Sequence, residues 1–350
     1  MKSLPRRPGN LLALIFAVGS AAGSIGWAET LDPPQYSEIQ RRLATGWNTW
    51  NTRSVLQQVL LPEAMAINLA LKKPAWLAEP YLRETLIGRR EEGAPTIRPG
   101  LRTDDGSYTA LDLEWQGFAA RIESAHDGDD LVVLITPGKI PELPVKLVVE
   151  AGMLWNRPGQ ISREGERQLT VSTPSRNIDV YSTANHLEDF YVQTLTPYLV
   201  LTVDETLGLS TGRSRTIDEI RQVVEVARGA LLEEADAFGD LAETYLAVQS
   251  GVAWNLVYEP RHDRVVSTVG RLWNEEYGGY CLFGWDNFFL AYVTALTSRD
   301  LAIANVVEHL RGATAEGFIP NDNRGNGSKS FDRSQPPVGG VMVREILKVI

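Results

Sequence analysis

The spacing of hydrophobic residues changes at about residue 216 of this chain. Before that point the apolar runs are short, rich in β-branched residues and separated by turn residues, as in Asp130–Pro137 (DLVVLITP) and Phe190–Asp204. Such runs predict antiparallel strands. We therefore expect residues 29–215 to form an antiparallel β-sandwich. One stretch within this region, Ser54–Lys73, could be partly helical.

From Thr216 onward the apolar residues recur at helical spacing. Thr216 and Glu219 form the pattern of a capping box, in which each residue satisfies a free N–H group of the other at a helix start. The apolar positions that follow predict a linker helix over residues 216–240, and residues 241–350 are expected to be helical. Further helices are expected to start at four places: near Leu241, near Trp285, after Ser298 and near Val338.

The first residues of the chain carry a separate signal. Basic residues precede the apolar run Leu11–Gly23, and small residues occupy the positions before a cleavage point at Ala28. This pattern is typical of a secretory signal peptide over residues 1–28, because the run is short for a transmembrane helix. The alternative is an uncleaved membrane anchor. We expect an exported protein, periplasmic or secreted, with no membrane span after cleavage.

Composition narrows the possible partners. The net charge of -10 argues against a nucleic-acid partner, which would require a basic face. Cys281 is the single cysteine, so no intrachain disulfide can form, and the four histidines match no metal or catalytic-triad spacing. Asn321–Asn326 offers oxygen ligands but lacks the spacing and the closing Glu of a calcium loop. No metal and no organic cofactor are expected.

Three stretches combine aromatic residues with amides, carboxylates and arginines: Gly46–Ser54, Trp273–Phe289 and Gly317–Pro337. Sugar-binding sites use aromatic rings against the C–H faces of the sugar and planar polar groups for its hydroxyls. Each stretch also has a structural interpretation. The tryptophans of the first could be core anchors, and the third could be a long surface loop.

Asp286 is the only charged residue of the aromatic stretch Tyr280–Phe289. A carboxylate in apolar surroundings costs free energy unless something compensates for it. The aromatic neighbours favour the protonated form of the side chain, whereas the positive end of the helix dipole favours the anion. Asp286 is therefore either a first-turn acid that stabilises its helix by about 0.3–1 kcal/mol or a group that transfers a proton.

The motifs of this region resemble those of a known enzyme family. GWDNFF at a helix start, followed by GFIPND and SQPP on the next long loop, is similar to glycoside hydrolase family 63, the family of processing α-glucosidase I. The resemblance covers roughly Ala242–Ile350 and is looser over the β-rich region. It implies an α+β multidomain protein, with a β-sandwich followed by part of an (α/α)6 barrel of the six-hairpin glycosidase type. The last expected helix is still running at Ile350, so we expect a truncated sequence or a split gene.

The resemblance also implies a reaction, the inverting hydrolysis of an α-glucosidic or related α-glycosidic bond in an oligosaccharide or disaccharide. It makes Asp286 the general acid, and no residue of the sequence matches the Glu that is the general base of the family. The chain could therefore be a non-catalytic fragment that at most binds carbohydrate, and a trehalase-type hydrolase is a further alternative. The residues expected to bind substrate are Trp273, Trp285, Phe288, Asn321, Arg333 and Gln335.

Overall fold

The computed structural model describes residues 34–73, 81–143, 145–189, 192, 194–272 and 279–350. The predicted signal peptide and Trp273 lie outside the described residues. Within those ranges the chain forms antiparallel β-sheets and six α-helices. None of the helices in these ranges is long and apolar enough to cross a membrane.

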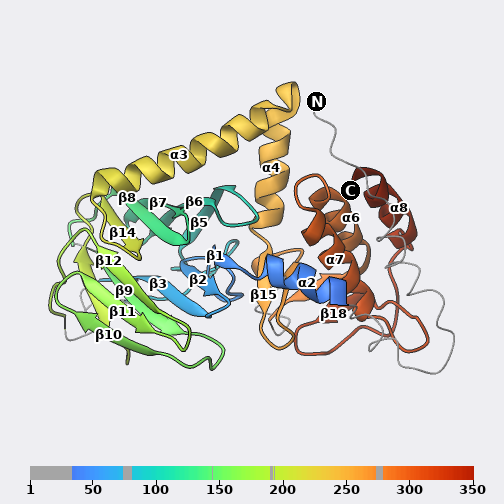
Figure 1. Ribbon diagram of the computed structural model, residues 1–350, viewed down its shortest axis with the longest axis horizontal. Helices are drawn as coiled ribbons and strands as arrows, with labels where there is room; N and C mark the ends of the chain where they lie inside the picture. Colours follow the sequence, from blue (N-terminus) through green and yellow to red (C-terminus); the bar gives the residue numbers. More distant parts are fainter. Residues whose placement is uncertain (1–33, 74–80, 144, 190–191, 193, 273–278) are drawn as a thin grey trace.

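Eight strands between residues 96 and 211 form the larger sheet (Figure 1). Its strands are β5 (Thr96–Arg102), β6 (Tyr108–Trp115), β7 (Phe118–Asp127), β8 (Asp130–Lys139), β10 (Gln160–Glu164), β11 (Gln168–Ser172), β12 (Asn177–Ser182) and β14 (Leu207–Thr211). They are hydrogen-bonded in the order β10-β11-β12-β14-β8-β7-β6-β5. Every pairing is antiparallel, as the short runs and turn signals of this region predict.

A second antiparallel sheet has six strands. They are β1 (Gly46–Asn48), β2 (Gln57–Leu61), β3 (Met65–Lys72), β4 (Tyr81–Leu82), β9 (Lys146–Met153) and β13 (Tyr198–Thr202). Five of them follow the order β1-β2-β3-β9-β13, and β4 pairs with the end of β3. Strands distant in sequence therefore become neighbours, as β3 and β9 do over their whole length.

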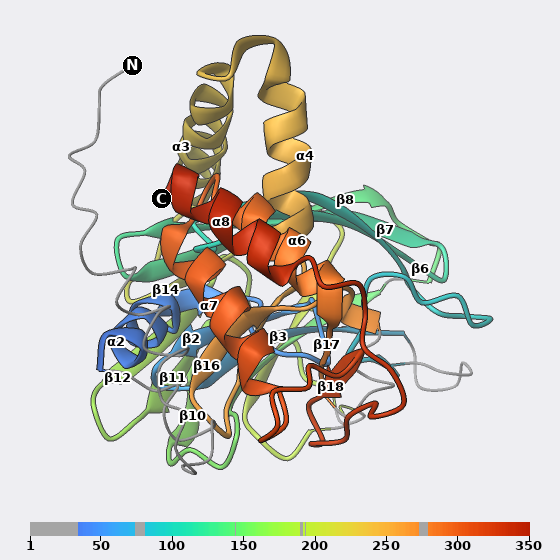
Figure 2. The same ribbon diagram turned by 90° about the vertical axis from the view of Figure 1, so that its right-hand side faces the viewer.

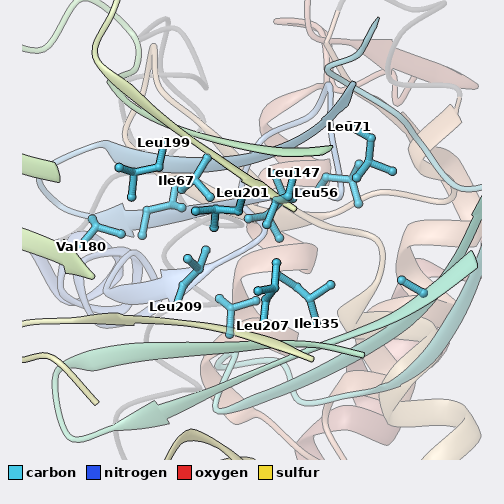
Figure 3. Packing of buried hydrophobic residues seen from close by; sticks show 14 of the residues in the cluster. Leu56, Ile67, Leu71, Ile135, Leu147, Val180, Leu199, Leu201, Leu207 and Leu209 are labelled. Carbon is cyan, nitrogen blue, oxygen red and sulfur yellow. The ribbon is translucent and has the colours of Figure 1, made fainter. Parts of the chain in front are cut away.

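The two sheets share one hydrophobic core (Figure 3). Ile67 and Leu147 from the six-stranded sheet face Ile135 and Leu207 from the eight-stranded sheet, and all four are at most 2% exposed. Removing this much apolar surface from water is the main force that holds the sheets together.

The prediction that Ser54–Lys73 is partly helical is wrong. This stretch forms β2 and β3, and every residue of both strands is buried. One face of these strands lies in the core between the sheets, and Val59, Leu61 and Ala66 on the other face pack against a second apolar cluster that includes Tyr258. Because both faces are covered, the alternation of polar and apolar residues that marks a half-exposed strand is absent.

The predicted helix after residue 216 is confirmed as α3 (Ile217–Asp236). Its capping box is present: the Thr216 hydroxyl accepts from the Glu219 N–H at 3.3 Å, and the Glu219 carboxylate accepts from the Thr216 N–H at 2.7 Å. The helix lies along the outer face of the eight-stranded sheet, where Ile220 and Val224 pack against residues of β7 and β8 (Figure 1). It leads into α4 (Ala242–Ala253).

The three later helices also start where the spacing predicts. They are α6 (Gly284–Thr294), α7 (Arg299–Arg311) and α8 (Gly339–Val349), and α6 packs against both others (Figure 2). Two small antiparallel sheets were not predicted: the hairpin of β15 (Leu256–Glu259) with β16 (Arg264–Ser267), and the two-stranded sheet of β17 (Cys281–Phe283) with β18 (Asp322–Arg324). The second sheet brings the loop after α7 to the start of α6.

A helix in the β-rich region, α2 (Pro34–Leu43), was also not predicted. It is tied to α7 by a buried polar network around Glu308, whose side chain is 0% exposed. The Tyr36 hydroxyl donates to Glu308 at 2.6 Å, Arg311 donates to it at 2.8 Å, and Arg264 forms an ion pair with it. Burial and then the nearby Glu308 carboxylate raise the pKa of the Tyr36 phenol, so Tyr36 remains a donor.

Candidate functional site

The first turn of α6, which carries Asp286, is held in place by hydrogen bonds of neighbouring residues. Strand β17 runs directly into the helix, and Phe283, the N-cap residue, contributes no side-chain capping bond. Asn287 compensates from within the helix, because its side-chain oxygen accepts from the Phe283 N–H at 2.8 Å. The same side chain is fully buried and donates to the Ser267 carbonyl at 3.0 Å, which fixes the helix start on β16. The backbone that carries Asp286 is therefore held on both sides.

Gln335, on the loop before α8, reaches the same turn. Its Oε1 accepts from the Trp285 N–H at 2.5 Å, and its Nε2 donates to Asp286 Oδ2 at 3.4 Å. Gly284 makes this approach possible, since a Cβ there would lie 2.7 Å from Gln335 Oε1. The partly buried carboxylate of Asp286 thus has an amide donor beside it.

A cavity of about 510 Å³ opens next to this turn. Trp285, Phe288, Phe318 and Gln335 are among the residues that line it, together with the prolines that follow Gln335. Trp285 is 40% exposed, so its ring is available to a ligand. The volume is in the range of small-molecule sites, which are mostly apolar with a few polar groups. Within the described part of the chain, no Asp or Glu side chain lines this cavity.

The remaining predicted binding residues border the site through their backbone. The Asn321 carbonyl accepts from the Gly284 N–H at 3.0 Å, and the Asn321 N–H donates to the Arg333 carbonyl at 3.0 Å. The Arg333 guanidinium is 64% exposed and pairs with Asp332. Neither side chain lines the cavity as the structure describes it, and Trp273 is not described. The structure therefore brings Trp285, Phe288 and Gln335 to the cavity, with Asp286 beside it.

Sequence reasoning missed Gly284 and Asn287, which hold the turn in place. Both belong to the GWDNFF motif, so a signal was present. A glycine at a helix start is compatible with close approach of another segment, and a buried Asn must find hydrogen-bond partners. Only the structure identifies those partners.

The stretch Gly46–Ser54 is not part of this cavity. Trp47 is 2% exposed and lies in the core between the sheets, and Trp50 is 1% exposed and lies in the cluster behind β2 and β3. The indole N–H groups donate to backbone carbonyls at 3.2 Å. The structural interpretation of these tryptophans as core anchors is confirmed.

The Cys281 thiol and the Asp322 carboxylate, both near the start of α6, are buried. Burial, and then the nearby Asp322 carboxylate, raise the pKa of the Cys281 thiol to about 12, which disfavours a reactive thiolate. In the residues that the structure describes, no three His, Cys, Asp or Glu side chains lie close enough to hold a metal ion. The Asp322 carboxylate instead pairs with Arg324 at 2.6 Å.

His309, on α7, lies behind the cavity wall. Its ring meets Phe288 edge-on, with the ring centroids 4.9 Å apart. Among the residues that the structure describes, neither ring nitrogen has a hydrogen-bond partner, and His309 is 1% exposed. Burial lowers the pKa of the imidazole to about 4, because a charged ring would lose its hydration without a compensating contact.

No protein-family model matches the sequence, and no curated protein gives a significant match. Solved structures similar to this chain include a bacterial glucoamylase complexed with acarbose, with 10% identity, coverage of 81% of this chain and 52% of that one, and a TM-score of 0.39. A family 92 glycosyl hydrolase has 12% identity, coverage of 88% and 53%, and a TM-score of 0.31. Both are glycoside hydrolases, and this chain spans about half the length of each. Likeness at this level does not establish a family.

Proposed function

We propose that this chain is part of a glycoside hydrolase that cleaves α-glucosidic or related α-glycosidic bonds with inversion. In this proposal Asp286 is the general acid, the two facing sheets correspond to a β-sandwich, and α6 to α8 belong to an (α/α)6 barrel. The observation that carries the proposal is the position of Asp286, beside an apolar, aromatic-lined cavity and within reach of the Gln335 amide. The motifs that resemble family 63 lie at this position.

The proposed reaction assigns a different task to each group. A protonated Asp286 would donate its proton to the glycosidic oxygen, so that the leaving sugar departs as an alcohol. Trp285 and Phe288 would contact the C–H faces of the sugar, and Asn321 and Arg333 would bind hydroxyls of a substrate that extends beyond the described lining of the cavity. Trp273 is assigned to the sugar pocket by the same proposal.

Inversion also requires a general base about 6.5–9.5 Å from the acid, with room for the attacking water between the two carboxyl groups. The described lining of the cavity contains no carboxylate for that role. This observation favours a second candidate function, in which the chain binds carbohydrate at the cavity without cleaving it.

We expect Asp286→Asn to lower the turnover of α-linked disaccharides by about 100-fold or more, because a neutral amide cannot supply the proton. Sugar binding should survive, since the isosteric amide retains the shape of the site. The measurement is glucose release by the purified chain, with Asp218→Asn on α3 as a matched control at an exposed carboxylate away from the cavity.

The possible outcomes separate the two functions. Saturable sugar binding without turnover by the unmodified chain would favour the binding function. Turnover that persists in Asp286→Asn would exclude Asp286 as the acid. A product released first as the α-anomer, detected by NMR, would rule out inversion.

A further inference from the structure

We propose that Gln335 is a positioning residue that holds Asp286 by its Oδ2 atom and leaves Oδ1 as the oxygen that carries the transferred proton. This inference rests on the proposed function, since it concerns the proposed acid. It gives Gln335 a role different from the binding of substrate hydroxyls expected from the sequence.

The orientation of the Gln335 amide follows from its partners. A backbone N–H can only donate, so the amide atom that faces the Trp285 N–H at 2.5 Å is the oxygen. The other amide atom is then the NH₂ group, which lies 3.4 Å from Asp286 Oδ2. The reverse orientation would place a donor against a donor and a carbonyl against a carboxyl oxygen that accepts.

This orientation decides which oxygen of Asp286 bears the proton. Oδ2 accepts a hydrogen bond from the Gln335 NH₂ group. A hydrogen atom on Oδ2 would point into the space that this hydrogen bond occupies. In the protonated acid the hydrogen therefore lies on Oδ1. Holding one oxygen also restricts rotation of the carboxyl group, which favours a fixed direction of proton transfer.

The backbone at the start of α6 and around Gln335 permits this contact. The N-cap residue of α6 provides no side-chain capping bond, and Gln335 supplies an acceptor to the first turn from another segment. Gly284 leaves the space, because its Cβ would lie 2.7 Å from Oε1 and 3.0 Å from Cβ of Gln335. Pro336 follows and restricts the backbone of Gln335 to extended conformations.

Two substitutions separate capping from positioning. Gln335→Glu keeps an acceptor for the Trp285 N–H but replaces the donor beside Asp286 with a carboxylate, whereas Gln335→Leu removes both interactions. The urea midpoint should fall in Gln335→Leu through loss of the capping acceptor, and in Gln335→Glu through repulsion between two neighbouring carboxylates. Gln222→Leu, the same kind of substitution at an exposed position of α3, is the matched control.

The decisive readout is the ¹³C resonance of the Asp286 carboxyl group in the full chain, assigned by its absence in Asp286→Asn. We expect it to move in both Gln335 variants and to stay in place in Gln222→Leu. A resonance that stays in place in Gln335→Leu, which introduces no charge beside Asp286, would overturn the inference. Because this readout needs no turnover, failure of the proposed function would not be mistaken for failure of the positioning role.

Kinetics distinguish positioning from substrate binding wherever the chain is active. Gln335→Glu should lower kcat by about tenfold or more while KM changes little, since the loss falls on the proton-transfer step. A rise in KM with an unchanged kcat would instead assign Gln335 to the binding of hydroxyls and would contradict the inference.

Gly284→Ala tests the contact by an independent route. Alanine normally stabilises a helix relative to glycine. Next to Gln335 the new Cβ should displace the amide, lower the urea midpoint and move the Asp286 resonance. In a Gln335→Gly background the same substitution should raise the midpoint. A rise in both backgrounds would show that Gln335 does not occupy the position assigned to it.

Discussion

Replacing Glu308 with alanine is expected to lower the free energy of unfolding by about 3–5 kcal/mol, because it leaves buried cationic partners without their carboxylate. Glu308 is 0% exposed and pairs with Arg264 and Arg311 while it accepts from Tyr36. These partners come from α2, α7 and β16, so the loss would affect the junction of three elements. Urea denaturation, with the slope checked for two-state behaviour, measures the change.

A matched control for this change is Glu38→Ala on α2. Glu38 is 43% exposed and pairs with Arg41 and Arg42 on the same helix. Exposed pairs of this kind contribute at most about 0.5 kcal/mol. If Glu308→Ala were no more harmful than Glu38→Ala, the network would not hold α2 to α7 as described.

Substituting His309 with leucine should make the protein more stable, and the gain should grow as the pH falls. At neutral pH we expect a gain of about 1–3 kcal/mol, because the substitution removes a buried ring whose nitrogens have no partner in the described part of the chain. Leucine also has the higher helix propensity and can pack against Phe288.

The pH dependence follows from the lowered pKa of His309. The imidazole has a pKa of about 4 in the folded chain, against an ordinary value of 6.5, so the unfolded chain binds the proton more readily. The stability linked to the neutral ring is fully present above pH 6.5, falls progressively as the pH drops below that value, and is lost once the pH has fallen through about 4. The advantage of His309→Leu should therefore widen by about 2 kcal/mol between about pH 7 and pH 5.

Unfolding curves of the two proteins over this range provide the test. Carboxylates titrate in both proteins, so the difference between the curves isolates His309. A constant difference would mean that the folded chain accommodates the charged imidazole.

Helices were predictable where periodicity and capping residues agreed. Ser298 caps α7 through its side chain, and the helix closes at Gly312, as the sequence indicates. The strands β2 and β3 were not predictable, because their burial on both faces depends on segments such as Tyr258, distant in sequence. Leucine, alanine and methionine in β3 also favour a helix when considered alone.

The candidate site also contains features that were predictable from the sequence and features that were not. Trp285, Asp286 and Phe288 lie together because they share one motif. The contact between Gln335 and Asp286 joins residues 49 positions apart, and it depends on the pairing of β17 with β18, which no local pattern indicated. Periodicity describes the face of a single element, whereas such a contact depends on how elements dock.

The attachment of α2 has a consequence for the order in which the chain folds. Tyr36 bonds to a residue 272 positions later in the sequence, and Gln40 bonds to Val265, 225 positions later. Contacts of such high sequence separation carry a large loop-closure cost and form slowly. During synthesis, both sheets can pair before α7 has emerged, while α2 still lacks its partner. Slow hydrogen exchange at the α2 amides would therefore mark the completion of folding.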